Sequence, residues 1–138
     1  MHPDLHEAKG RMRQLSIVVP IYCQRVVFLV GPRKDYECWV KKTYEYATDD
    51  RDLAGECIVL KHTTTKEKHY IVWLKTFDWY VSDMAVLAHE VMHLTDFFCQ
   101  QVGIKPDEVE PRGYLHEYLM KTALTWLKPK QHRKKKRR

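Results

Sequence analysis

The sequence has few cysteines, and none of them are spaced for pairing. Cys23, Cys38, Cys57 and Cys99 are scattered through the 138 residues without a C-x-x-C pair. Disulfide scaffolds and zinc ribbons need closely paired cysteines, so both classes are excluded. The pattern predicts reduced thiols and a cytoplasmic protein.

The sequence also lacks an apolar run long enough to cross a membrane. Its most apolar stretch, LSIVVPIYCQRVVFLVG, is interrupted by Pro20, Gln24 and Arg25, whereas a spanning helix needs about 20 predominantly apolar residues. The first ten residues, MHPDLHEAKG, are polar and charged, which is not the pattern of a secretory signal. We therefore expect no membrane partner.

Acidic residues are absent from the end of the chain. From Lys128 onward the sequence contains eight Lys or Arg and no Asp or Glu. Without those eight, 16 basic residues remain against 18 acidic ones, so the rest carries about −2 although the whole chain carries +6. Residues 128–138 are predicted to be a disordered basic tail. Such a tail is a candidate for non-specific nucleic-acid binding through counterion release, and the alternative is a solvated tail without a partner.

The remaining patterns predict one α+β domain over residues 14–127, preceded by a flexible segment, 1–13, with no internal repeat. Runs rich in β-branched residues predict four strands, at 15–21, 25–31, 56–62 and 69–75. Apolar residues at helical spacing predict a helix over 32–47 that packs on this small mixed sheet. A long helix is predicted over 83–101 after an N-cap at Ser82, with Gly103 as its C-terminal cap, and a last helix from Pro111 to about Trp126.

The long helix contains the one motif that indicates chemistry. His89, Glu90 and His93 form H-E-x-x-H. Residues four apart lie on one helix face, so both imidazoles can bind one zinc ion at about 2.0–2.1 Å. Glu90 lies about 100° further round, where it can take a proton from a metal-bound water. The motif therefore indicates a hydrolytic zinc site with Glu90 as the general base.

The competing interpretation is a buried helix that carries two histidines by chance. Nearly all of the residues around the motif are apolar, which predicts that the helix is buried on all sides. Buried His and Glu side chains need partners, and a metal ion supplies one. This context favours zinc.

A catalytic zinc needs a third protein ligand. A metzincin would have a Gly at position 96 and a ligand at position 99, but this chain has Asp96 and Cys99, so that class is disfavoured. A glutamate on the following helix is the gluzincin alternative. Glu108, Glu110 and Glu117 are the candidates, and helix geometry alone does not choose among them.

The stretch YIVWLK…MAVLAHEVMHLTDFFCQQVGIKPDEVEPRGYLHEYL resembles small zincin-like metallopeptidases encoded by bacteriophages. Their pattern is an I-V-W-L strand, an A-H-E-x-x-H helix, a G-I-K turn and E-A-x-A-Y-L-x-G-Y-L, and the resemblance covers roughly residues 54–120. It implies a minimal zincin-like domain, in which an active-site helix is followed by a ligand-bearing helix. The third ligand of the family falls on Glu110. Pro111 and Glu117 depart from the family pattern, so Glu117 remains a rival ligand.

Three further features have predicted roles in such a site. Asp96 lies on the ligand face and could orient a ligand imidazole, or it is simply a solvated acid. Tyr114 lies on the face of Glu110 and could donate a hydrogen bond to a tetrahedral intermediate, although tyrosines at this spacing are more often core residues. The strand HYIVWLK could pair with an extended substrate through a free edge, or be an ordinary core strand.

Together these features predict a zinc metallopeptidase that acts on a peptide or protein, encoded by a phage and located in the bacterial cytoplasm or associated with the virion. His89, His93 and Glu110 would bind zinc, and Glu90 and Tyr114 would be catalytic. Two alternatives have no turnover: a zinc-stabilised binding protein, and a phage structural or packaging factor that uses the basic tail.

Overall fold

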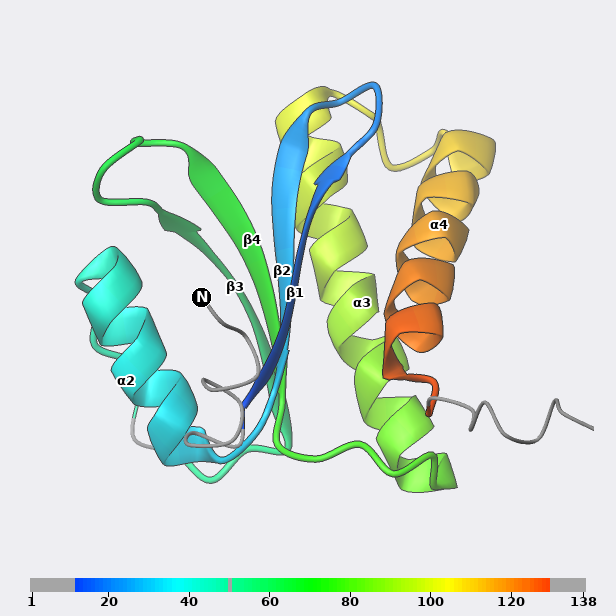
Figure 1. The fold of residues 1–138 in the computed structure, drawn as a ribbon. Coiled ribbons are helices and arrows are strands. Elements are labelled where there is room, and N and C mark those ends of the chain that lie inside the picture. Colours follow the sequence, from blue (N-terminus) through cyan, green and yellow to red (C-terminus); the bar gives the residue numbers. More distant parts are fainter. Residues whose placement is uncertain (1–11, 50, 130–138) are drawn as a thin grey trace, which may run out of the picture.

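Four strands form one mixed sheet in a computed structural model that describes residues 12–49 and 51–129. The strands are β1 (Arg13–Val19), β2 (Gln24–Val30), β3 (Gly55–Lys61) and β4 (Lys68–Leu74), and their order in the sheet is β1-β2-β4-β3. β1 and β2 form one antiparallel hairpin and β3 and β4 another, while β2 and β4 pair in parallel at the centre. Figure 1 shows the sheet between two layers of helices.

The two central strands are apolar on both faces. Residues Val26–Val30 of β2 and His69–Leu74 of β4 are all buried, as expected for strands that are covered by helices on both sides. The expectation that HYIVWLK has a free edge is wrong, because β4 pairs with β2 on one side and with β3 on the other. Among the strands that the structure describes, β3 is the one with a free edge on that side of the sheet.

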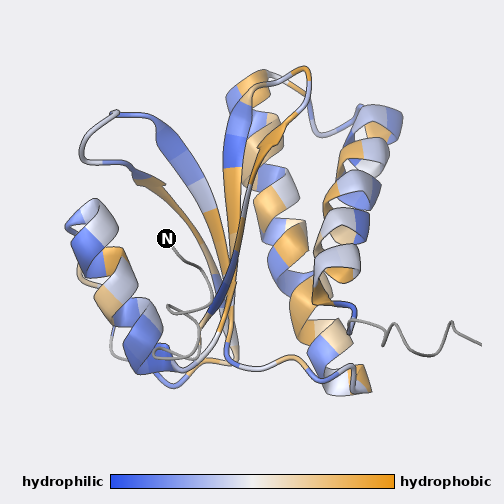
Figure 2. Ribbon diagram, viewed as in Figure 1, coloured by the Kyte–Doolittle hydropathy of each residue, from blue (hydrophilic) through white to orange (hydrophobic). Residues whose placement is uncertain are grey.

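One helix covers one face of the sheet, and two helices cover the other (Figure 1). The single helix is α2 (Arg33–Tyr44), and the pair on the opposite face is α3 (Val81–Val102) and α4 (Val109–Leu127). Alternating side chains of β2, β3 and β4 therefore enter two separate cores, whereas alternate side chains of β1, such as Val18, are exposed. Figure 2 shows the apolar residues concentrated on the sheet and on the helix faces turned toward it.

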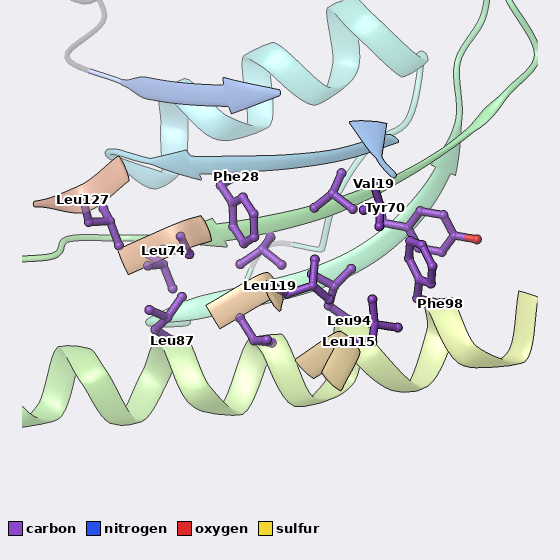
Figure 3. Close-up of a cluster of buried hydrophobic side chains, with 14 of the residues drawn as sticks. Val19, Phe28, Tyr70, Leu74, Leu87, Leu94, Phe98, Leu115, Leu119 and Leu127 are labelled. Carbon is purple, nitrogen blue, oxygen red and sulfur yellow. The ribbon is translucent and has the colours of Figure 1, made fainter. Parts of the chain in front are cut away.

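The larger core lies between the sheet and the α3–α4 pair. Figure 3 shows Phe28, Tyr70 and Leu74 of the strands against Leu87, Leu94 and Phe98 of α3, with Leu115, Leu119 and Leu127 of α4 completing the cluster. The smaller core holds Trp73 of β4, stacked on Tyr36 of α2 with ring centroids 4.9 Å apart. No helix among the described residues is long and apolar enough to span a membrane.

The helix ends differ slightly from the predicted ones. α3 begins at Val81 with Tyr80 as its N-cap, not Ser82, because the Asp83 carboxylate accepts hydrogen bonds from the backbone N–H groups of Asp78 and Tyr80. Gly103 ends α3 with a φ of 84°, as predicted. α4 starts at Val109, two residues before Pro111, so this proline lies within the first turn, where it is tolerated.

The predicted α+β class is confirmed. At the N-terminal boundary, Met12 is buried in the smaller core and Arg13 opens β1, so the folded part begins before residue 14. The rest of the segment predicted to be flexible, residues 1–11, lies outside the described residues, as does most of the basic tail.

Candidate functional site

The H-E-x-x-H motif lies near the middle of α3, and its two imidazoles converge. Nε2 of His89 and Nε2 of His93 are 3.1 Å apart, and their ring centroids are 4.7 Å apart. Two nitrogen ligands of a tetrahedral zinc, each at 2.0–2.1 Å, would lie about 3.3 Å from each other. The two Nε2 atoms form a hydrogen bond with each other, at close to the separation that two nitrogen ligands of one ion would have.

The helix is not buried on all sides as predicted. His89 is exposed and His93 is half-buried, and two apolar neighbours, Met92 and Phe97, are also exposed, at 46% and 36%. The apolar stripe that enters the core is formed by residues such as Leu87, Val91 and Leu94 at helical spacing. The histidines lie at the edge of this stripe, so solvent can reach the point at which they converge.

Glu90 is positioned differently from the histidines. Its side chain is buried, with 8% exposure, and it makes no hydrogen bond within the described residues. Burial raises the pKa of its carboxyl group above the ordinary value. His89 and His93 oppose that rise, and the charge of Glu56 adds to it. Glu90 also lines a pocket, so its carboxylate is largely buried yet can be reached from that pocket, which is typical of a functional group.

A pocket of about 340 Å³ joins these three residues to the free edge of the sheet. We call it the motif pocket. One wall is formed by His89, Glu90 and His93 of α3, and the floor by the consecutive residues Gly55–Ile58 of β3. The other wall is formed by five residues of the loop between α2 and β3, from Tyr46 to Leu53. Because successive strand residues face opposite sides of a sheet, four consecutive lining residues mean that the pocket wraps around the edge of β3.

The register of β3 shows which backbone groups face this pocket. The N–H of Lys75 donates to the carbonyl of Ala54, and the N–H of His62 donates to the carbonyl of Glu67. Hydrogen-bonded pairs alternate along an antiparallel ladder, so Glu56 and Ile58 also bond to β4. The N–H and C=O groups of Gly55 and Cys57 therefore point outward, unpaired within the sheet, beside the motif.

An arginine of α2 holds the loop wall in place. The Arg33 guanidinium donates to the carbonyl of Asp49 at 2.7 Å and to the carboxylate of Glu56 at 3.2 Å. Glu56 also accepts a hydrogen bond from the hydroxyl of Tyr36 at 2.8 Å, and Arg33 lies over the ring of Trp73 at 4.9 Å. Charge-assisted contacts of this kind fix the orientation of both partners. The loop wall and the edge of β3 are thus joined through one side chain.

The glutamates of α4 do not line the motif pocket. Glu110 lines a different pocket, between α4 and the turn that joins β1 to β2, and Glu117 lines a third one beside β1. Within residues 12–49 and 51–129, no three His, Cys, Asp or Glu side chains converge closely enough to hold a metal ion. The structure brings together the histidine pair and the neighbouring Glu90, and it leaves Glu110 and Glu117 apart from them.

Two other predicted residues have their contacts elsewhere. A carboxylate oxygen of Asp96 forms an ion pair with the guanidinium of Arg112, which connects α3 to α4. Tyr114 is 67% exposed and lines the two α4 pockets rather than the motif pocket. Tyr46 is the tyrosine that lines the motif pocket.

The loop and β3 side of the pocket was not predicted from the sequence. Tyr46, Asp49, Arg51, Glu56 and Cys57 line it, yet they belong to no motif. Tyr46 was predicted to lie within the helix over 32–47, which instead ends at Tyr44, so this residue belongs to the loop. These residues could have been predicted only if the sequence had indicated that β3, rather than β4, has the free edge.

No protein-family model matches this sequence, and neither a curated protein nor a solved structure matches it. The fold and site define an α+β domain that carries an H-E-x-x-H motif beside a free strand edge.

Proposed function

We propose that this protein is a zinc-dependent metallohydrolase that cleaves peptide bonds, with His89 and His93 as metal ligands and Glu90 as the general base. One observation supports it above all: the Nε2 atoms of the two histidines lie 3.1 Å apart, and the largely buried Glu90 lines the same pocket as both of them. A structural metal site would need no such carboxylate.

The residues fit a metal ion in part. The histidine pair has the donor type and the separation that zinc requires. A third protein donor is not assembled with the pair. The resemblance to phage metallopeptidases favours Glu110 for this role, with Glu117 as its rival. Either glutamate would have to approach the pair when the metal binds, and the Asp96–Arg112 ion pair would resist movement of α4.

Bound zinc would supply a water molecule with a lowered pKa and would polarise the substrate carbonyl. Glu90 would accept the proton of that water and return it to the leaving amine. Its raised pKa brings a carboxyl group closer to the range in which it can do both. The apolar neighbours Leu87, Val91 and Leu94 hold α3 against the sheet and so fix Glu90 beside β3.

The edge of β3 supports a peptide as the substrate. An extended peptide can pair with a free strand edge through its backbone, without regard to its sequence. The outward N–H and C=O groups of Cys57 lie in the floor of the same pocket that holds the motif. A peptide paired there would have its backbone next to Glu90. The resemblance adds an expected phage origin and action in the cytoplasm of a bacterial host.

Metal analysis of the purified full chain tests the metal site. We expect about one zinc per chain, and loss of tight binding in His89→Ala and in His93→Ala, because each removes one of few ligands. Glu110→Gln and Glu117→Gln identify the third donor, since only the true ligand should weaken zinc binding. Wild-type zinc content in both histidine variants would reject the site.

Glu90→Gln tests the chemistry separately. This variant should keep its zinc and lose peptide cleavage by at least about 100-fold, because only the proton acceptor is removed. Digestion of a peptide library by the wild type, with and without a chelator, is the reference. Zinc binding without any cleavage by the wild type would instead favour the zinc-stabilised binding protein.

A further inference from the structure

The two walls of the motif pocket differ in chemistry. The α3 wall presents His89, Glu90 and His93, whereas the loop wall presents the ring of Tyr46 and the side chain of Leu53. Ile58 of β3 lies on the same side of the sheet as the loop wall, because Leu53 and Ile58 both pack against the smaller core, under α2. Apolar side chains of the smaller core thus reach the surface at the edge of β3.

Charged residues on the loop wall are already paired. The Arg51 guanidinium lies 3.1 Å from the Asp49 carboxylate, and Glu56 is held by Arg33 and Tyr36. Thr48 adds a hydroxyl group to this wall, and Tyr46 and Leu53 are its apolar members. Tyr46 is 44% exposed although it is a large aromatic residue. Beside Ile58, the exposed ring of Tyr46 and the side chain of Leu53 favour burial of an apolar side chain over a charged one.

Strand pairing determines which side chain of a bound peptide meets which wall. A peptide residue that pairs with Cys57 shares its face of the sheet, and Cys57 packs on the α3 side. The residues immediately before and after it pair with Glu56 and Ile58 and share their face, on the loop side. One peptide residue therefore faces the motif, and its neighbours face Tyr46 and Leu53.

We propose that Tyr46, Leu53 and Ile58 form a specificity subsite, which selects an apolar side chain on a residue next to the one that faces the motif. The inference rests on the proposed function for its occupant, an extended peptide. It goes further in assigning the selectivity to the loop wall, which the H-E-x-x-H motif does not include.

Equilibrium binding to the full-length Glu90→Gln protein tests this without turnover. The probe is a fluorescent library of end-blocked hexapeptides in which each position in turn is fixed as Leu, Phe, Lys or Asp. At one position or more we expect Leu and Phe to bind about tenfold more tightly than Lys or Asp, a typical effect of one apolar contact in a pocket. Tyr46→Ala should remove most of that preference.

Matched variants separate the subsite from general effects. Tyr118→Ala also removes a partly exposed tyrosine, but Tyr118 is on α4 and outside the motif pocket, so the preference should persist. Tyr46→Arg should shift the preference toward Asp. Thermal unfolding of each variant shows that the fold is retained.

The outcomes distinguish the subsite from the hydrolase. Binding without an apolar preference, or a preference that Tyr46→Ala leaves intact, overturns the subsite even if the wild type cleaves peptides. A preference that depends on Tyr46, in a protein that never cleaves, supports the subsite and rejects the hydrolase. Absence of both binding and cleavage rejects both.

Discussion

Gly55 determines how closely α3 approaches the edge of the sheet. A Cβ atom at this position would lie 2.8 Å from Cγ1 of Val86 and 3.1 Å from both Cγ of Glu90 and the carbonyl oxygen of Trp73. Any larger residue would therefore force Val86 or its surroundings to shift. The contact places Glu90 directly against β3.

We expect Gly55→Ala to destabilise the protein by about 1–3 kcal/mol, because the added methyl group overpacks the contact between β3 and α3. This corresponds to a fall in Tm of roughly 3–10 °C in thermal unfolding. Gly113→Ala on α4 is the control, since no atom of the described residues lies within 4 Å of its added Cβ. It should stabilise by about 0.5–1 kcal/mol through helix propensity. Equal effects of the two substitutions would contradict the close contact.

His69 links stability to pH. It is buried beside Tyr44, whose hydroxyl lies 2.9 Å from its Nδ1. Burial, together with the neighbouring His62 and Arg25, lowers the pKa of His69, and Glu67 opposes this. The unfolded chain therefore binds the proton more readily, so stability is complete above about pH 6.5 and declines as pH falls toward the folded-state pKa. His69→Gln should show a smaller fall in Tm between pH 7.5 and 5 than the wild type. An equal fall in Tm in the wild type and in the variant would assign the pH dependence of stability to another group.

At the scale of elements, one edge of β3 is paired with β4 and the other edge is exposed. Its even-numbered residues bond to β4, while the N–H of Cys57 faces the motif pocket. Proline is tolerated on an edge strand where the missing N–H would face solvent. Cys57→Pro should therefore keep the ladder to β4 and lose one hydrogen bond to a paired peptide.

In the Glu90→Gln background, we expect Cys57→Pro to weaken peptide binding by about tenfold, the effect of about 1.4 kcal/mol. Cys57→Ala keeps the N–H and removes only the thiol, so its binding should stay near that of the parent. Fluorescence anisotropy with one labelled peptide measures both. Weakening by Cys57→Ala to the same extent would assign the effect to the side chain instead of the strand edge.

The positions of the strands and helices along the chain were largely predictable, but the order of the strands in the sheet was not. β-Branched runs and helical spacing are local signals, so all four strands and the three described helices lie close to their predicted positions. The order β1-β2-β4-β3 depends on which apolar faces fit together over long separations. The sequence of β4, apolar on both faces, was consistent with a central strand, but its neighbour β3 carries no signal of a free edge.

The site was predictable only within one helix. The convergence of His89 and His93 follows from a spacing of four residues. The partner of Asp96 and the position of Glu110 depend instead on how α4 packs against α3. The Asp96–Arg112 ion pair joins the two helices, and helical spacing within α3 alone does not predict it. The loop wall of the motif pocket depends on Arg33, 16 residues away from Asp49 in the chain.

At the scale of the whole molecule, the excess positive charge is concentrated at the C-terminal end of the sequence. Deleting residues 128–138 should change the net charge from +6 to about −2. It should leave the Tm nearly unchanged, because the segment has no large apolar side chain to bury.

Any affinity for DNA or RNA should disappear when this segment is deleted. In the full chain, that affinity should fall steeply between 50 and 200 mM salt. Electrophoretic mobility shifts at several salt concentrations measure this. Salt-insensitive binding by the truncated protein would place the nucleic-acid surface in the folded domain.

The parallel ladder between the two hairpins has a consequence for synthesis on the ribosome. Arg25 pairs with His69 and Val30 with Leu74, so each partner in β4 follows β2 by 44 residues. At about 5–20 residues per second, β2 leaves the ribosome roughly 2–9 s before β4 does. During that interval the apolar strand VVFLV has β1 on one edge and nothing on the other. We expect this nascent hairpin to be a stage at which the open strand edge promotes aggregation and chaperone binding.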